Sequence, residues 1–184
     1  MDGGTSWAKP ESQPDGGGVH GVLLDPQDSS ILYAWNGRGL FKSVDSGVSW
    51  NSVSRQSGLM LAIDPRNSGT MYMASGDPGI FKSVDGGASW NPVNSGLPAA
   101  SYNGTLNHRV TTVVIDPQNT STLYAGTVSF GVFKSTDGGA SWSALNSGLT
   151  TLSIAALAFN PHDTSVLYGS TAAGVFTITL ANAP

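Results

Sequence analysis

The chain has 184 residues, which is enough for one domain with a sizeable hydrophobic core. Only 11% of the residues are charged, against about 25% in an average domain, and the acidic residues are eleven Asp and a single Glu. Because Glu favours helices while Asp and the 24 glycines favour turns, this composition excludes a long helical bundle and predicts an all-β protein. The net charge is −4 without any basic run, so we expect no nucleic-acid and no membrane partner.

Four short apolar runs follow one another near residues 19–24, 31–35, 39–43 and 49–53. Turn residues separate these runs, and related units begin near residues 58, 110 and 154. Four short strands in a unit of about 40–50 residues are typical of a β-propeller blade. The predicted fold class is therefore all-β, a β-propeller with four four-stranded blades that form a single domain over residues 1–184.

Three landmarks recur in each unit in the same order. The first is an Asp-Pro or Asn-Pro pair, at 25–26, 64–65, 116–117 and 160–161. The second is a tyrosine eight residues further on: Tyr33, Tyr72, Tyr124 and Tyr168. The third is a Gly-apolar-Phe triplet, at 39–41, 79–81, 131–133 and 174–176. Since Pro has no N–H to donate to a sheet, the first landmark is expected to end the innermost strand of each blade.

Three units continue into the motif Ser-x-Asp-x-Gly-x-Ser-Trp, at 43–50, 83–90 and 135–142. The Asp carboxylate can accept hydrogen bonds from backbone N–H groups and the glycine can take positive φ, so we expect a tight turn with its Trp between blades. The fourth unit lacks this motif, but Asp2-Gly3-Gly4-Thr5-Ser6-Trp7 stands at the other end of the chain. We therefore expect residues 2–9 to supply the outer strand of the last blade.

The motif resembles the Asp-box, or bacterial neuraminidase repeat, of propellers such as sialidases, xyloglucanases, sortilin-type receptor domains and the photosystem II assembly factor. This resemblance covers nearly the whole chain and implies that the box residues are structural: Asp2, Asp45, Asp85, Asp137, Trp7, Trp50, Trp90 and Trp142. The relatives differ in activity, so the resemblance specifies the fold and leaves the function open.

Residues that break the repeat are the candidates for function. The remaining aromatic residues are Trp35, Tyr102 and Phe130, and the remaining cations are Lys9, Arg38, Arg55, Arg66 and Arg109. In a propeller, the loops between the second and third strands and the connections between blades share one face, here called the top face. The predicted ligand-binding residues on this face are Trp35, Asn36, Arg38, Tyr102, His108, Arg109 and Phe130.

Stacking aromatic residues with polar neighbours suit a glycan or a peptide. The leading interpretation is therefore a non-catalytic binding or assembly module, and not an enzyme. The alternative is a hydrolase of glycosidase or esterase type at the central channel, with His20, His108, Asp77 and Asp15 as candidate catalytic residues. A third interpretation is a propeller fragment whose main property is self-assembly.

The resemblance tests the hydrolase alternative. Sialidases use three arginines, a Tyr–Glu pair and an Asp acid, and the only Glu here, Glu11, lies in a Pro/Gly-rich connector, so that set does not carry over. Xyloglucanase-like enzymes use two Asp carboxylates and two propeller domains. Outside the repeat turns, Asp15 and Asp77 are the candidates for such a pair.

The chain has no Cys, which excludes disulfides and thiolate metal sites, and we expect neither a cofactor nor a metal. The first residues lack the pattern of a signal peptide, so we expect none in this sequence; relatives of the resembling families are often exported, and the compartment stays open. Four units could close alone as a small ring, but we favour a homodimer in which each N-terminal strand completes the partner's last blade.

Overall fold

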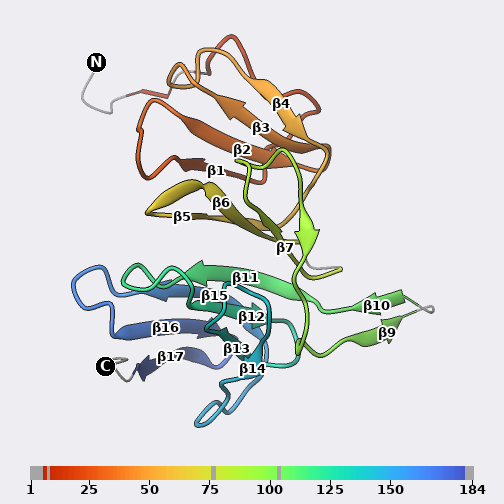
Figure 1. The fold of residues 1–184 in the computed structure, drawn as a ribbon, viewed down its shortest axis with the longest axis vertical. Helices are drawn as coiled ribbons and strands as arrows, with labels where there is room; N and C mark the ends of the chain where they lie inside the picture. The colour runs from red at the N-terminus through yellow and green to blue at the C-terminus, as the bar shows by residue number, and fades with distance from the viewer. Residues whose placement is uncertain (1–5, 8, 76–77, 103–104, 181–184) are drawn as a thin grey trace.

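The computed structural model describes residues 6–7, 9–75, 78–102 and 105–180. Within these ranges all regular elements are β-strands, and no helix there could cross a membrane. Four antiparallel sheets follow one another in chain order: the first two are stacked along the longest axis of the molecule, and the third and fourth lie side by side at its other end (Figure 1). This arrangement is that of a propeller whose blades form an open arc.

Each sheet is built from consecutive strands in simple order. Blade one contains β1 (Gly21–Leu24), β2 (Leu32–Asn36), β3 (Gly39–Ser43) and β4 (Asn51–Ser54). Blade two contains β5 (Met60–Asp64), β6 (Asn67–Ala74), β7 (Ile80–Ser83) and β8 (Asn91–Pro92). Blade three contains β11 (Val110–Ile115), β12 (Leu123–Thr127), β13 (Val132–Ser135) and β14 (Ser143–Ala144). Blade four contains β15 (Ile154–Phe159), β16 (Val166–Thr171) and β17 (Gly174–Thr179).

The predicted fold class is confirmed, the expected outer strand of blade four stays a prediction, and one element was not expected. The described part of blade four has three strands, and the expected fourth strand, residues 2–9, falls mostly outside the described residues. Between blades two and three, β9 (Ala100–Tyr102) and β10 (Thr105–Asn107) form an additional two-stranded hairpin that projects from the body (Figure 1). The pattern of four runs per unit did not predict this hairpin.

The Asp-Pro landmark ends the innermost strand of each blade with the same hydrogen bond. The side chain of the first residue accepts a bond from the backbone N–H two residues later, at 2.8–3.0 Å: Asp25 to Gln27, Asp64 to Arg66, Asp116 to Gln118 and Asn160 to His162. Since the proline cannot donate to the ladder, this bond satisfies the next donor and turns the chain into the second strand.

The Ser-x-Asp-x-Gly-x-Ser-Trp segments form identical turns in the first three blades, here called the repeat turns. In blade three, the Ser135 hydroxyl donates to Asp137 at 2.7 Å and accepts from the Gly139 N–H at 2.9 Å, while the Ser141 N–H donates to the same carboxylate at 2.9 Å. The corresponding bonds in blades one and two differ by at most 0.1 Å. The repeated sequence therefore encodes one conserved local geometry.

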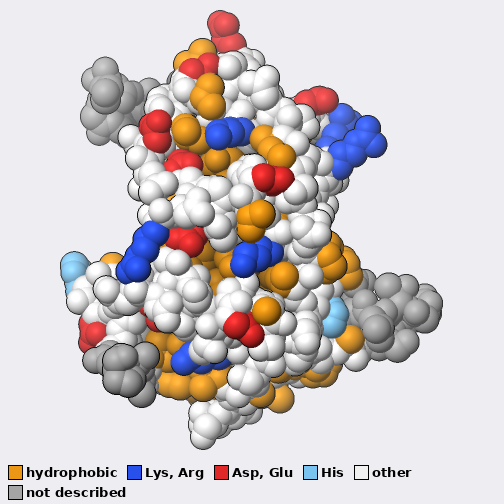
Figure 2. All heavy atoms as spheres, viewed as in Figure 1, with side chains coloured by type: hydrophobic (Ala, Val, Ile, Leu, Met, Phe, Trp, Pro, Cys, Tyr) orange, Lys and Arg blue, Asp and Glu red, His pale blue; other side chains and the backbone are white. Residues whose placement is uncertain are grey.

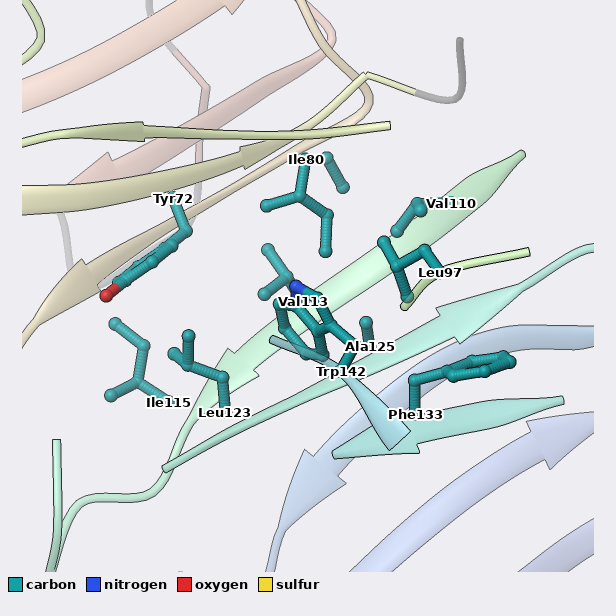
Figure 3. Packing of buried hydrophobic residues seen from close by; sticks show 11 residues of the cluster. Tyr72, Ile80, Leu97, Val110, Val113, Ile115, Leu123, Ala125, Phe133 and Trp142 are labelled. Atoms are coloured by element: carbon teal, nitrogen blue, oxygen red, sulfur yellow. The ribbon is translucent and has the colours of Figure 1, made fainter. Parts of the chain in front are cut away.

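Apolar side chains of adjacent blades pack face to face. Figure 3 shows Tyr72 and Ile80 of blade two next to Val113 and Trp142 of blade three. The Tyr72 hydroxyl donates to the Gly138 carbonyl at 3.0 Å, which joins blade two to the repeat turn of blade three. In each of the first three blades the repeat lysine lies over the repeat tyrosine, Lys82 over Tyr72 at 5.4 Å, which explains why a cation follows the repeat phenylalanine.

Candidate functional site

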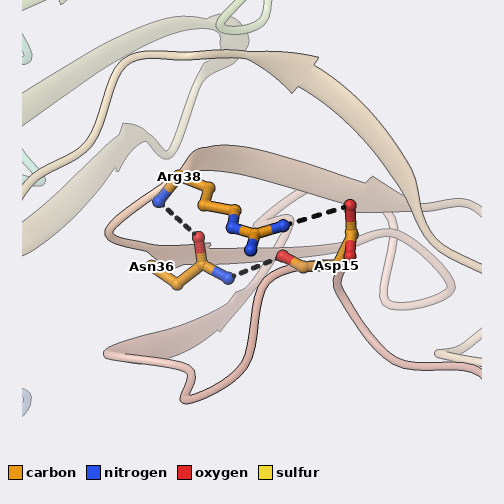
Figure 4. Close-up of polar contacts among 3 residues, drawn as sticks. All are labelled: Asp15, Asn36 and Arg38. Atoms are coloured by element: carbon orange, nitrogen blue, oxygen red, sulfur yellow. Dashed lines mark hydrogen bonds and ion pairs between the residues drawn. The ribbon is translucent and has the colours of Figure 1, made fainter.

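The charged residues that break the repeat gather at the top of blade one. The Arg38 guanidinium pairs with the Asp15 carboxylate at 3.6 Å, and both side chains are well exposed. Asn36 links the two segments, because its side-chain amide donates to the Asp15 carbonyl at 3.0 Å and its oxygen accepts from the Arg38 N–H at 2.8 Å (Figure 4). The β2–β3 turn therefore positions the connector that precedes β1.

Two clefts open on this part of the molecule and share Arg55. The first, about 440 Å³, lies between the tops of blades one and two and is lined by His20, Arg55, Gln56, Ser57, Gly58, Leu59, Ser75, Pro78 and Phe81. The second, about 460 Å³, is lined by Gln13, Asp15, Arg38, Phe41, Trp50, Ser52 and Arg55. Of the predicted residues, the structure thus brings His20, Asp15 and Arg38 to neighbouring clefts.

Asp77 lies outside the described residues, so the predicted pair of Asp15 and Asp77 stays a prediction. Ser75 and Pro78, which flank the segment that contains Asp77, line the same cleft as His20. The β6–β7 connection of blade two therefore borders the cleft from the side opposite blade one.

Trp35 is not on the surface. Its side chain is only 6% exposed and belongs to the core between blades one and two, and its indole N–H has no hydrogen-bond partner. The ring lies over Gly21, its partner on β1, where a larger side chain would collide with it. This burial leaves no ring face for a ligand, and it argues against the stacking role predicted for Trp35.

The remaining predicted residues belong to the connection before blade three and to a loop of that blade. Phe130 is half-buried against the core between blades two and three, and His108 is half-buried with its Nδ1 at 3.2 Å from the Pro98 carbonyl. Arg109 is exposed with a positive φ of 51°. Tyr102 ends β9, and its side chain is outside the described part of the chain. These residues line neither of the two clefts described above.

The carboxylates divide into two groups. In the repeat turns, hydrogen bonds from Ser49, Ser89 and Ser141, then from the preceding serines, lower the pKa of Asp45, Asp85 and Asp137 to about 2. Bonds from Ser30 and Ser165 likewise lower the pKa of Asp28 and Asp163. Groups held this strongly as anions are unsuited to donate a proton near neutral pH. Asp15 accepts no such bonds from a turn and pairs with a cation instead.

Sequence reasoning overlooked Arg55 as a site residue. It is one of the cations that break the repeat, and it follows β4 directly, on a connection that belongs to the top face. Both facts were available in the sequence. In the described residues, no group of three or more His, Asp or Glu side chains could hold a metal ion.

Comparisons with known proteins support the propeller fold and favour one of the predicted functions over the others. No family model matches the chain. An oligoxyloglucan-reducing end-specific xyloglucanase of Emericella nidulans is 33% identical over 147 residues, which are 70% of this chain and 18% of the relative. The crystal structure of a glycoside hydrolase family 74 enzyme of Niastella koreensis is 27% identical with a TM-score of 0.69, over 89% of this chain and 29% of that one.

A structure of YCF48 bound to D1 peptide is 18% identical with a TM-score of 0.67, over 98% of this chain and 56% of that one, which supports the propeller fold alone. The chain spans about a fifth of the length of the curated relative it matches. The expectation of a non-catalytic binding or assembly module is wrong on this comparison, because the similar proteins at the higher identities are hydrolases. The hydrolase alternative fits better.

Proposed function

We propose that this chain is a glycoside hydrolase module of xyloglucanase type, and that its substrate lies along the top of blades one and two. The observation that carries the proposal is the 33% identity to a xyloglucanase over 147 residues. The fold agrees, because the same arc of blades matches a family 74 enzyme with a TM-score of 0.69. The substrate class, a xyloglucan oligosaccharide, is taken from the name of the curated relative.

The chemistry of glycoside hydrolysis supports the choice of residues. Most glycosidases need two carboxyl groups, one of which protonates the departing oxygen while the other acts as base or nucleophile. The turn carboxylates are fixed as anions by serine hydrogen bonds, as described above. We therefore assign the two roles to Asp15 and Asp77, with Arg38 holding Asp15 and with His20 and Arg55 contacting the substrate in the first cleft.

We also propose that the repeat turns are Asp-boxes. The recurring sequence and the recurring bonds from serine to aspartate support this name for the three described turns. On this proposal the boxes stabilise the blades and take no part in catalysis.

The test is hydrolysis of xyloglucan oligosaccharides by the full chain, with the product masses determined by mass spectrometry. Cleavage of these oligosaccharides is expected, and the variants Asp15→Asn and Asp77→Asn should each lower the rate by about 10²-fold or more. Asp28→Asn is the matched control, because Asp28 is an exposed carboxylate in a turn at the other end of blade one. Absence of cleavage, or cleavage that survives both site variants, would overturn the proposal.

A further inference from the structure

An apolar pocket lies between blades three and four. In blade four it is lined by residues of all three described strands, including the last one, β17. Residues of both blades line it: Val132, Leu145, Ser147, Gly148, Leu149, Ile154, Leu157, Leu167, Gly169, Phe176, Thr177 and Ile178. We call this the blade-four pocket. Figure 2 shows hydrophobic side chains gathered at the end of the molecule where Figure 1 places β17.

The preceding interface, between blades two and three, has a tryptophan at the corresponding place. The Trp142 indole N–H donates to the Val93 carbonyl at 2.8 Å, and the Trp142 backbone N–H donates to the Ser95 carbonyl at 2.9 Å. Trp142 itself belongs to the core that includes Ile80, Leu97 and Val113. The outer edge of blade two is therefore covered by the repeat turn of blade three.

The outer edge of blade three has the same sequence as the outer edge of blade two, but no tryptophan of the described residues covers it. Asn146-Ser147-Gly148-Leu149 repeats the residues at 94–97, and both glycines have nearly the same φ, 87° and 85°. A side chain on Gly96 would collide with the Trp142 carbonyl oxygen, whereas a Cβ on Gly148 would meet nothing within 4 Å. The blade-four pocket is thus the place of a tryptophan that blade four lacks.

Of the repeat-turn tryptophans, Trp142 is buried, Trp50 and Trp90 are half-buried, and one is fully exposed. Trp7 is fully exposed, and it ends the sequence Asp2-Gly3-Gly4-Thr5-Ser6-Trp7, which differs from residues 137–142 at a single position. The spacing agrees as well, because Val19 follows Trp7 by twelve residues and Ile154 follows Trp142 by twelve. In sequence and spacing, the N-terminal segment matches a repeat turn followed by an outer strand.

The connector that follows the N-terminal segment is placed far from the blade-four pocket of its own chain. Pro14 is buried, and Gln13 and Asp15 line a cleft with Trp50, so the connector packs on blade one. In Figure 1 blade one lies far from β17 along the longest axis. The described connector residues 13–15 therefore pack on blade one and not on blade four.

Both ends of the arc expose side chains that are buried in the inner blades. Val22 of β1 is 60% exposed, whereas Leu61 at the same place in β5 is 3% exposed. At the opposite end, Val175 of β17 is 69% exposed, whereas Val132 at the same place in β13 is 7% exposed. Each of these faces needs a neighbouring blade.

We propose that the blade-four pocket binds Trp7 of a second copy of this chain, whose residues 2–9 add the fourth strand to β17. By analogy with the pairing of β13 and β14, Ala8 would stand opposite Thr177 and Lys9 opposite Phe176. Blade one of the second copy then covers Val175, and the reciprocal contact closes two chains into a ring of eight blades.

The first test is the mass of the full chain by light scattering. Wild type should show twice the chain mass of 18.9 kDa, and Trp7→Ala and Leu149→Glu should each reduce it to one chain mass. Val84→Glu is the matched control, because Val84 is an exposed apolar residue outside the pocket, and it should keep the double mass. A wild-type mass of 18.9 kDa, or a double mass that survives both variants, would overturn the proposal.

A mixing experiment separates exchange between chains from closure within one chain. Trp7→Ala keeps an intact pocket and Leu149→Glu keeps an intact Trp7, so the mixture can form one intact junction per pair while neither variant alone can form any. We expect the mixture to regain the double mass. An excess of a synthetic peptide of residues 2–9 should also dissociate the wild-type pair, whereas the same peptide with Trp7→Ala should leave the pair intact. A mixture that stays at one chain mass would contradict the exchange.

Discussion

The interfaces on the two sides of blade three are built from the same repeat, and only the one toward blade two contains a tryptophan among its described residues. Toward blade two, the core is completed by Trp142, whose indole N–H bonds to the Val93 carbonyl. Toward blade four, the core consists of Tyr124, Val132, Ile154, Leu157 and Leu167 and borders an apolar pocket. The difference teaches that the packing between two blades depends on a tryptophan that the repeat turn of the later blade supplies.

The comparison also separates the pairing of strands within a blade from the burial of its side chains against the next blade. Blade four forms its three described strands in register, with pairs from Val166–Thr179 to Thr171–Gly174, although no repeat turn follows β17 in the chain. Tyr168 of blade four is nevertheless only half-buried, whereas Tyr124 of blade three is fully buried. The strands therefore form from local sequence, and the burial depends on the neighbouring blade.

The largest expected effect comes from removing Trp142 from the interface between blades two and three, which then resembles the interface between blades three and four. Trp142→Ala should lower the free energy of unfolding by about 3–5 kcal/mol, because it removes a buried indole and leaves a cavity between blades two and three. Urea denaturation followed by far-UV circular dichroism measures this loss. The control is Trp50→Ala, since Trp50 holds the same place in blade one but is only half-buried. Equal losses for the two variants would contradict the comparison.

Most of the fold could be predicted from the sequence because the repeat is expressed in local chemistry. The Asp-Pro pair and the Ser-x-Asp-x-Gly turn each form bonds between residues two to four apart, so their positions mark the strands directly. The hairpin of β9 and β10 was missed because it is an insertion in one connection, and a comparison of the units with one another says nothing about such a segment.

The candidate site could be predicted only in part. Asp15 and Arg38 were recognised because they break the repeat, and the structure pairs them. Trp35 also breaks the repeat, but for a packing reason. Opposite Trp35 stands Gly21, whereas blade two pairs Met60 with Ala74, so the large and small residues have exchanged places across the strands. That exchange is visible in the sequence once the strand register is known, and the register is what the sequence alone did not specify.

The second prediction concerns the repeat turn of blade three, a turn that the described part of blade four does not have. Ser135 is buried, and its hydroxyl bonds both to the Asp137 carboxylate and to the Gly139 N–H. Ser135→Ala should lower the free energy of unfolding by about 1–3 kcal/mol, because it leaves a buried N–H without its acceptor. Thr179→Ala, an exposed hydroxyl at the end of β17, is the control and should change it by less than about 0.5 kcal/mol. If both variants unfold at the same urea concentration, the turn does not stabilise blade three.

The third prediction uses the hydroxyl that joins blades two and three. Tyr72→Phe removes the bond to the Gly138 carbonyl and should cost about 1 kcal/mol at neutral pH. Burial, then the charges of Asp64 and Asp137, raise the pKa of Tyr72 to about 12 from an ordinary value of 10.0. Because the folded-state pKa is raised, the tyrosine contributes stability below pH 10, and this contribution is lost as the pH rises toward 12. The difference in free energy of unfolding between wild type and Tyr72→Phe should therefore shrink in that range.

Tyr168→Phe is the matched change in blade four, where the tyrosine is half-buried. It should alter the free energy of unfolding by less than Tyr72→Phe does at neutral pH. Urea denaturation at several pH values between 8 and about 11 measures both variants. A difference between wild type and Tyr72→Phe that stays constant over this range would show that the hydroxyl is not buried at the interface.

The smallest expected effect is one that appears only in acid. Serine hydrogen bonds hold the pKa of Asp45, Asp85 and Asp137 at about 2, below the ordinary value of 3.8. A depressed pKa in the folded state stabilises the fold above pH 3.8, and this contribution is lost as the pH falls through 2. Wild type should therefore lose stability between about pH 4 and pH 2, and Asp137→Asn, already weakened at neutral pH, should lose less over that interval. The two slopes follow from urea denaturation at each pH. Equal slopes would mean that protonation of the repeat turns does not weaken the blades, and that the turns stabilise them through the serine hydroxyls alone.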